Sequence, residues 1–220
     1  MRLTRFCRRR LRSLAAITAP NASNSRSIKD APPPAASPPR SQEANPVISP
    51  QHYPDLFAPR DWGFLSWQFT LNIPPDSLIA NVNLVPFVGD QCVILHFENG
   101  KWEIPGGTLE PGEHYLATVH REALEEAGAR VDSFHPLGAW ACHSPLDKPY
   151  RPHMPHPDFF RLVGYGDVEL ITQPTMPEGG EKVARVEIVP IPEAERRFRS
   201  CDRADLADLY RLAAHLRKSP

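Results

Sequence analysis

The alternation of apolar and polar residues predicts mainly strands after residue 60. Two β-rich runs, 80–88 and 91–97, are separated only by Gly89 and Asp90, a spacing typical of a hairpin. The Pro-Gly-Gly sequence at 105–107 is expected to stop the short run that precedes it. Five further segments have a comparable strand composition, namely residues 66–72, 101–104, 131–142, 159–165 and 183–191.

Two segments instead repeat apolar residues with the spacing of an amphipathic helix. The first follows Pro111 and Gly112 and reaches Gly128, a residue suited to a helix C-terminus. The second covers residues 204–216. Mixed strands with two main helices predict an α/β or α+β sandwich. The residues expected to face the core are Leu116, Val119, Ala123 and Ala127 in the first helix, and Leu206, Leu209, Tyr210, Ala213 and Leu216 in the second.

The N-terminal part has a different composition. Eight of the 25 lysines and arginines lie within residues 1–29, before the first acidic residue, Asp30. Residues 31–60 then contain nine prolines, which remove backbone donors and favour extended chain. We therefore expect a disordered basic and proline-rich segment over residues 1–45, followed by an irregular lead-in over residues 46–77.

This charge asymmetry bears on partners and on localisation. Beyond the basic start, 17 basic residues remain against 26 acidic ones, so the body of the protein lacks the positive patch of a duplex nucleic-acid binder. The arginine-rich, acid-free start resembles a mitochondrial or plastid transit peptide, and the alternative is a disordered basic tail. We expect a cytoplasmic protein, with mitochondrial localisation as the alternative.

The composition, 41% apolar and 23% charged, is typical of a globular protein. No run of about 18 apolar residues occurs, so we expect no membrane-spanning helix and no membrane partner. The four cysteines lie far apart without a C-x-x-C pair, which argues against a disulfide scaffold or a zinc ribbon. Those that follow the N-terminal segment are expected to be buried small hydrophobes: Cys92, Cys142 and Cys201.

The first predicted helix carries an unusual group of acids. Glu122, Glu125 and Glu126 are spaced i, i+3 and i+4, so their side chains share one face. Three neighbouring carboxylates repel one another, and helix stability does not require them. A hard divalent cation does require such a group, because Mg²⁺ takes oxygen ligands at about 2.0–2.1 Å. The alternative is a solvated acidic face.

The residues around this group resemble a known family signature. The pattern G-x5-E-x7-R-E-U-x-E-E-x-G-U, the Nudix box, is matched at every fixed position, with alanine at both U positions. The matching residues are Gly107, Glu113, Arg121, Glu122, Ala123, Glu125, Glu126, Gly128 and Ala129. The chain therefore resembles the Nudix hydrolases.

This resemblance implies an α/β Nudix fold, in which a mixed β-sheet is sandwiched between α-helices. The domain would cover residues 78–200, with a C-terminal helix over residues 201–220 packing on it. The implied activity is that of a pyrophosphatase, a hydrolase acting on acid anhydrides. It would cleave the diphosphate linkage of a nucleoside diphosphate derivative with Mg²⁺ or Mn²⁺ as the cofactor.

The resemblance also implies roles for the residues of the box. Arg121 would orient Glu113 through a charged hydrogen bond. The general base would be Glu125 or Glu126, or an acid in a later loop such as Glu181, with Glu178 as its competitor. The implied metal ligands are the carboxylates of Glu122, Glu125 and Glu126 and the backbone carbonyl of Gly107.

A proline-rich, aromatic stretch over residues 140–160 is a candidate specificity loop. Lys148 or Arg151 would contact phosphate, and Trp140 or Tyr150 would stack on a base; a plain surface or packing role is the alternative for each. A zinc site is disfavoured because the spacing of the histidines matches no helical pair: His143, His153 and His156.

The leading interpretation is an enzyme that acts on a small-molecule nucleotide diphosphate derivative, with a homodimer as a possible assembly. The alternative is a non-catalytic module that senses a nucleotide. Degenerate domains of that kind usually lack a glutamate of the box, whereas all four are present here. RNA decapping is a third possibility, which the acidic body of the chain disfavours.

Overall fold

The computed structural model describes residues 48–175 and 182–219. The expected segment over residues 1–45, Glu178 and Glu181 lie outside the described residues. The elements in chain order are α1 (Pro54–Phe57), β1 (Arg60–Asp61), β2 (Ser66–Thr70), the 3-10 turn η1 (Asp76–Leu78), β3 (Ile79–Val88), β4 (Gln91–Phe97), β5 (Trp102–Glu103), β6 (Gly106–Thr108), α2 (Tyr115–Ala127), β7 (Ala129–Val131), β8 (His135–His143), β9 (Asp158–Leu170), β10 (Val183–Val189), α3 (Ile191–Ser200) and α4 (Ala204–Lys218).

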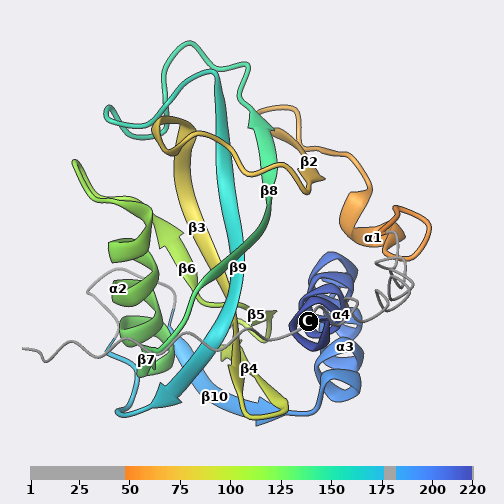
Figure 1. Ribbon diagram of the computed structural model, residues 1–220. Coiled ribbons are helices and arrows are strands. Elements are labelled where there is room, and N and C mark those ends of the chain that lie inside the picture. The colour runs from red at the N-terminus through yellow and green to blue at the C-terminus, as the bar shows by residue number, and fades with distance from the viewer. Residues whose placement is uncertain (1–47, 176–181, 220) are drawn as a thin grey trace, which may run out of the picture. The chain divides into compact units, whose positions relative to one another are not determined.

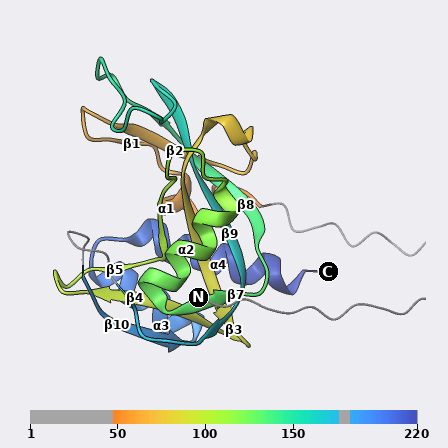
Figure 2. The same cartoon turned by 90° about the vertical axis from the view of Figure 1, so that its left-hand side faces the viewer.

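A mixed β-sheet forms the centre of the described part. Its strand order is β1-β2-β8-β9-β3-β4-β10; β3 and β9 are parallel, and the other neighbours are antiparallel. The short strands β5, β6 and β7 pair with β4, β3 and β9. The helix α2 covers one face of the sheet, and α3 and α4 cover the other (Figure 1, Figure 2). The predicted α/β fold, a mixed sheet between helices, is confirmed.

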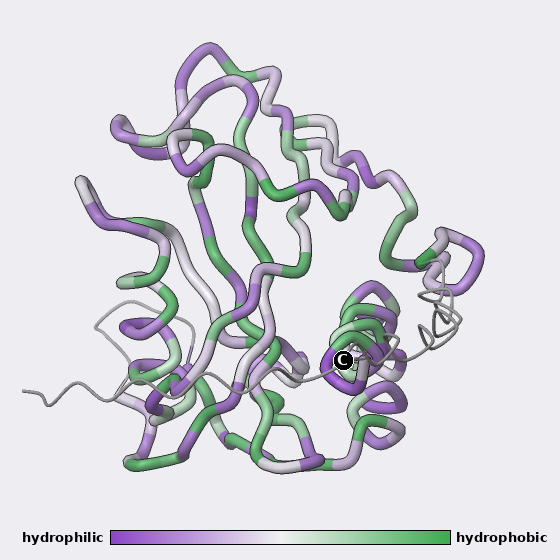
Figure 3. The backbone as a smooth tube through the Cα atoms, viewed as in Figure 1, coloured by the Kyte–Doolittle hydropathy of each residue, from purple (hydrophilic) through white to green (hydrophobic). Residues whose placement is uncertain are grey.

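Burial on both faces explains the nearly continuous apolar run of β3. Val82 and Leu84 pack in the core that includes the apolar residues of α2, whereas Val85 and Phe87 pack in the core that includes those of α4. Successive strand residues point to opposite faces, so one strand supplies both cores. Helix α2 has one buried face, whereas α4 is buried on all sides over residues 205–210. Figure 3 shows hydrophobic and hydrophilic residues alternating around both helices.

The predicted hairpin and the predicted end of the first helix are confirmed. Val88 pairs with Gln91 across the turn, where Gly89 has a φ of +59°. Helix α2 ends before Gly128, whose φ is +62°. One core assignment in this helix is wrong: Leu116 is 40% exposed. The buried face includes Thr118 and Glu122, so it is turned toward the acidic side of the helix and leaves Leu116 outside.

The structure differs from the predicted elements at three further places. Residues 105–107 do not simply end a strand, because Gly106–Thr108 forms β6 and pairs with β3. The predicted strand 131–142 is divided between β7 and β8. Helix α3 was not predicted, although Pro192 in its first turn and the i, i+3 pair of Glu193 and Arg196 are typical helix signals.

The folded part begins earlier than residue 60. The segment 46–77, expected to be irregular, contains α1, β1 and β2, and it contributes Tyr53, Leu56 and Phe69 to the core. Local composition did not reveal this, because the burial of Tyr53 and Leu56 depends on α4, which is distant in sequence.

Two of the three cysteines expected to be small buried hydrophobes are buried. Burial raises the pKa of Cys92 to about 12 and that of Cys142 to about 11, whereas Cys201 is only partly buried. Among the described residues, no helix combines the length and apolar character needed to cross a bilayer.

Candidate active site

The helix that carries the acidic residues is defined by its two ends. The amide of Leu116 donates to His114 Nδ1 at 3.2 Å in the first turn, and Gly128 closes the last turn in a left-handed conformation. Glu125 and Glu126 lie in that last turn, where the helix dipole disfavours negative charge, and the turn contains no basic residue. Helix stability therefore does not account for these two acids.

Arg121 connects the box loop to the helix. Its Nε and Nη2 atoms donate to the two carboxylate oxygens of Glu113, both at 3.0 Å, in a bidentate pair. Nη2 also donates to the carbonyl of Thr108 at 3.2 Å. This pair lowers the pKa of Glu113 to about 2. The geometry agrees with the expected orientation of Glu113 by Arg121.

The same guanidinium reaches the predicted metal ligands. Nη1 of Arg121 lies 2.7 Å from Glu122 Oε1 and 3.4 Å from Glu125 Oε2. Glu122 is 9% exposed, and desolvation raises the pKa of its carboxyl despite Arg121. Arg121 thus neutralises part of the repulsion that three neighbouring acids would otherwise create.

Glu126 lies on the side of the helix that faces β6. Its Oε2 accepts a hydrogen bond from the backbone amide of Gly106 at 2.9 Å. Desolvation raises the pKa of Glu126 to about 8, and the nearby charges of Glu122, Glu125 and Glu103 add to this effect. A carboxylate in such surroundings is stabilised by a cation.

The backbone of β6 lies directly against the carboxylate of Glu122. A Cβ atom added to Gly107 would lie much closer to that carboxylate than the 3.0 Å that real Cβ atoms respect. Only glycine allows this approach without displacement of Glu122. The carboxylates of the helix and the Gly107 backbone, predicted to act together, are therefore adjacent in space.

These donors fit a hard divalent cation. They are all oxygens, and they surround a site whose partly buried acids have raised pKa values. Within residues 48–175 and 182–219, no three carboxylate, imidazole or thiol side chains converge closely enough to hold an ion by themselves. Mg²⁺ is commonly held by one or two carboxylates together with waters and substrate phosphates, so the set is of the usual kind.

The acids proposed as bases are placed only in part. Glu125 is half-buried and faces Arg121, as described above. Glu181 and its competitor Glu178 lie outside the described residues. Their position relative to the box therefore remains a prediction.

The candidate specificity loop joins β8 to β9. Tyr150 is 83% exposed, and the Arg151 guanidinium carbon lies 6.0 Å from its ring centroid. Lys148 is also exposed. The loop reaches the box through His153, whose Nε2 lies 2.8 Å from the carbonyl of Leu109. The substrate contacts predicted for Lys148, Tyr150 and Arg151 remain predictions.

Trp140, the fourth predicted substrate contact, is buried in β8. It is 3% exposed, packs edge-to-face on Phe69 and lies under the guanidinium of Arg161 at 5.2 Å. The Trp140 ring is therefore already in contact with Phe69 and with Arg161. Trp140 forms the floor of a cavity rather than an open stacking surface.

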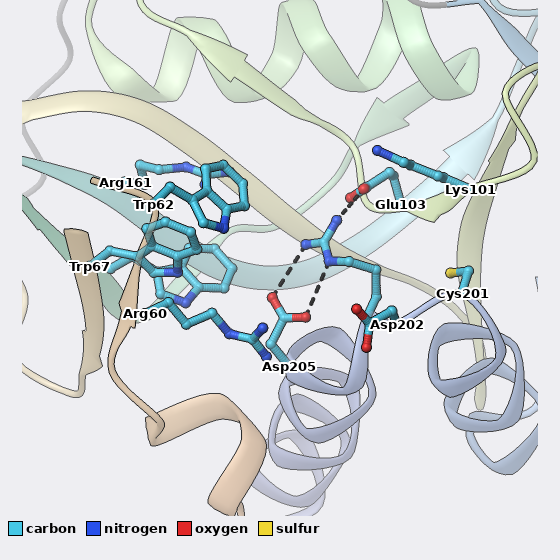
Figure 4. Close-up of a pocket in the computed structure, with 11 residues that line it drawn as sticks. Arg60, Trp62, Trp67, Lys101, Glu103, Arg161, Cys201, Asp202 and Asp205 are labelled. Atoms are coloured by element: carbon cyan, nitrogen blue, oxygen red, sulfur yellow. Dashed lines mark hydrogen bonds and ion pairs between the residues drawn. The ribbon is translucent and has the colours of Figure 1, made fainter. Parts of the chain in front are cut away.

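This cavity has a volume of about 480 Å³ and lies on the sheet face opposite α2 (Figure 4). Figure 4 shows two unlike walls. One contains the side chains of Trp62 and Trp67. The other contains Glu103 and Asp205. Both accept hydrogen bonds from Arg203, Asp205 at 3.1 Å.

A row of paired strand residues crosses the sheet under the cavity, and two of its members, Trp140 and Arg161, line it. Asn81 of β3 pairs with Arg161 of β9, which pairs with Trp140 of β8, which pairs with Phe69 of β2. Residues paired in this way point to the same face of a sheet. The sequence did not indicate Arg161 as a site residue; its only signal was a charged residue within the apolar run of residues 159–165.

The cavity and the acidic helix share a boundary. Glu103 lines the cavity, and its charge contributes to the raised pKa of Glu126. Asn83, whose Oδ1 accepts from Arg161 at 3.4 Å, pairs in register with Gly106, whose amide binds Glu126. Two residues of the cavity, Glu103 and Arg161, are therefore linked to the β6 backbone and the carboxylate of Glu126.

The chain is similar to a known family and to several solved structures. A family model described as the NUDIX domain matches residues 79–211. A search of curated proteins gave no match. Similar solved structures include a mutant of the pyrophosphohydrolase BsRppH from Bacillus subtilis, with 21% identity, a TM-score of 0.46 and coverage of 59% of this chain and 74% of that one. A NUDIX hydrolase from Nitrosomonas europaea has 21% identity, a TM-score of 0.46 and coverage of 63% and 88%.

The matched region, residues 79–211, is more than half of the chain. It contains the complete box, the helix α2 that presents the acids, and the cavity residues of β5, β8 and β9, whereas Arg60, Trp62 and Trp67 precede it. The predicted family resemblance is therefore confirmed, and the chain belongs to the Nudix family.

Proposed function

We propose that the protein hydrolyses the diphosphate linkage of a nucleoside diphosphate derivative with Mg²⁺ or Mn²⁺ as cofactor. Membership of the Nudix family supports hydrolysis of pyrophosphate bonds in general, and its members generally need divalent metal ions. The observation that carries the finer proposal is the contact between the β6 glycine backbone and the carboxylates of Glu122 and Glu126.

The residues that would hold the cation are Glu122, Glu125 and Glu126, with the Gly107 carbonyl. When bound, a divalent ion supplies charge neutralisation on phosphoryl oxygens and lowers the pKa of bound water. Arg121 fixes the acids of the box through its bonds to Glu113 and Glu122.

Proton transfer from the attacking water requires a base. Glu125 and Glu181 are our candidates, with Glu126 and Glu178 as their competitors. A base must lie within about 2.6–3.2 Å of the proton donor, or reach it through one water. Glu125 faces the carboxylate cluster, whereas Glu181 precedes β10. Comparing the pH dependence of turnover in E125Q and E181Q variants distinguishes the two, because loss of the base removes the acidic limb of the profile.

A substrate panel tests the proposed activity. The full-length protein is incubated with nucleoside diphosphates linked to sugars, to nucleosides or to further phosphates, each with Mg²⁺, Mn²⁺ or EDTA. We expect at least one substrate to release a nucleoside monophosphate by chromatography, with no product in EDTA and recovery when metal is added back. Product formation that persists in EDTA, or no product from any substrate, would contradict the proposal and favour a nucleotide-sensing module.

A further inference from the structure

The cavity wall that faces solvent is built by the turn between β1 and β2. The Trp62 amide donates to the carbonyl of Leu65 at 3.0 Å, and the Gly63 amide donates to Asp61 Oδ1 at 2.6 Å, with Gly63 at a φ of +81°. This tight turn holds the Trp62 ring edge-to-face against Trp67, with 4.5 Å between the ring centroids.

Trp62 is 65% exposed although it lines the cavity. A large apolar ring that remains exposed beside a cavity offers a face on which a flat aromatic ligand can stack. Phe64, in the same turn, is 53% exposed but does not line the cavity. The turn therefore provides a matched pair of exposed aromatic residues, one inside the cavity wall and one outside it.

The cavity floor contains a cation with an incomplete set of partners. Arg161 makes one long hydrogen bond, to Asn83 Oδ1 at 3.4 Å, and no carboxylate of the described residues lies within ion-pair distance of it. The nearby acids Glu103 and Asp205 are paired with Arg203. Desolvation lowers the pKa of Arg161, which reflects the cost of holding this charge away from water.

Asn81, the strand neighbour of Arg161, does not line the cavity, and it also has an unpaired polar atom. Asn81 pairs in register with Arg161, and its buried Oδ1 accepts no hydrogen bond from the described residues. Buried polar groups are nearly always satisfied, so the underused donors of Arg161, which do line the cavity, indicate a missing ligand with acceptor atoms. The floor thus presents a planar fork of N–H donors.

We propose that this cavity binds the base of the substrate, with Trp62 stacking on its face and Arg161 selecting guanine. The proposal rests on the proposed function for the presence of a nucleotide, and it adds which base is chosen. The volume of about 480 Å³ lies within the usual range for small-molecule sites.

The edge of guanine matches the donors of Arg161. N7 and O6 are adjacent acceptors and suit the bidentate fork of an arginine. Adenine carries an amino donor where guanine carries O6, so the fork of Arg161 loses one of its two acceptors. A neutral amide or hydroxyl in place of Arg161 would not impose this preference for guanine over adenine.

A binding experiment without turnover tests the assignment. The full-length protein in EDTA is titrated calorimetrically with GMP and with AMP, and Kd is measured for each. We expect GMP to bind more tightly, by roughly 5- to 150-fold, the range for one bidentate arginine–guanine contact. The variant R161K keeps the charge but not the fork, and we expect the ratio of the two Kd values to fall to within about threefold.

Variants of Trp62 and Phe64, the two exposed aromatic residues of the turn, form the second part of the binding experiment. W62A should weaken GMP and AMP to a similar extent, by roughly 5- to 150-fold, because stacking does not depend on the identity of the base. F64A is the matched control: Phe64 contacts the Trp62 ring, with 6.0 Å between the centroids, but does not line the cavity, so F64A should change both Kd values much less than W62A does. Both side chains are exposed, so the variants should unfold at nearly the wild-type temperature, which keeps the test valid if R161K fails to fold.

Three outcomes would overturn the assignment. Equal Kd values for GMP and AMP would remove the selection by Arg161. Displacement of both nucleotides by millimolar inorganic phosphate, with equal Kd values, would place a phosphate on Arg161. Equal effects of W62A and F64A would remove the stacking role. Because no catalysis is measured, GMP selection with no hydrolysis would refute the proposed function alone, and hydrolysis without GMP selection would refute this inference alone.

Discussion

Arg121 and Glu113 form a bidentate ion pair in which Nε and Nη2 donate to the two carboxylate oxygens, both at 3.0 Å. Their side chains are 27% and 14% exposed. Because the remaining guanidinium nitrogen reaches Glu122, this pair couples the loop before α2 to the acids of the helix. The conformation of the acidic site therefore depends on a residue that need not touch substrate.

Replacement of Arg121 by lysine should distinguish the effect of the paired hydrogen bonds from the effect of the positive charge. An ammonium group cannot reproduce the planar fork, so R121K should lose the paired hydrogen bonds to Glu113 while it keeps the positive charge. We expect the free energy of unfolding to fall by about 1–3 kcal/mol and kcat to fall about 10- to 100-fold. Urea unfolding and steady-state kinetics measure the two effects; wild-type kcat in a folded R121K protein would contradict the coupling.

Glu126→Gln tests the metal-ligand assignment. The amide retains the size of the side chain and can still accept a hydrogen bond from Gly106, so the melting temperature should change little. Turnover should fall by at least about 100-fold, more than is typical for loss of a residue that only supports a ligand. Glu110→Gln, an exposed acid in the preceding loop, is the matched control and should keep full activity. Comparable activity in the two variants would remove Glu126 from the site.

Gly107→Ala should displace a predicted metal ligand without removing any ligand atom. The added methyl group would collide with the carboxylate of Glu122 and push it away from the helix face that it now occupies. We expect a loss of stability of about 1–3 kcal/mol, as for overpacking of a filled site, together with a rise in the metal concentration needed for half-maximal activity. Thr108→Ala, in the same strand, preserves the carbonyl bound by Arg121 and should leave the metal requirement unchanged.

A separate prediction concerns the packing of α1, α3 and α4. Asp208 is fully buried and accepts hydrogen bonds from the Asp55 amide at 2.9 Å, from Arg199 at 2.9 Å and from Arg211 at 3.1 Å. Asp208→Ala removes a shared acceptor from all three donors. It should lower the free energy of unfolding by about 1–3 kcal/mol. Asp90→Ala, in the exposed hairpin turn, is the control; equal stability of the two variants in urea would contradict the role of Asp208.

Local patterns determined the elements that depend on neighbouring residues. The Gly89-Asp90 hairpin, the helix that ends at Gly128 and the spacing of the acids in that helix all follow from sequence separations of a few residues. The box was also readable from the sequence, because its chemistry requires fixed residue types at fixed distances along one helix and one loop. The same local basis made Arg121 and Glu113 predictable as partners.

Only the tertiary structure decided which residues surround the cavity. Trp62, Trp140, Arg161 and Arg203 come from segments that are far apart in sequence, and the sheet register and the packing of α4 bring them together. Trp140 became a buried floor residue because strand pairing places it between Phe69 and Arg161. The sequence by itself therefore determined the acidic helix and its family, since helix periodicity is local, whereas the residues facing the ligand were decided by strand pairing, which is not.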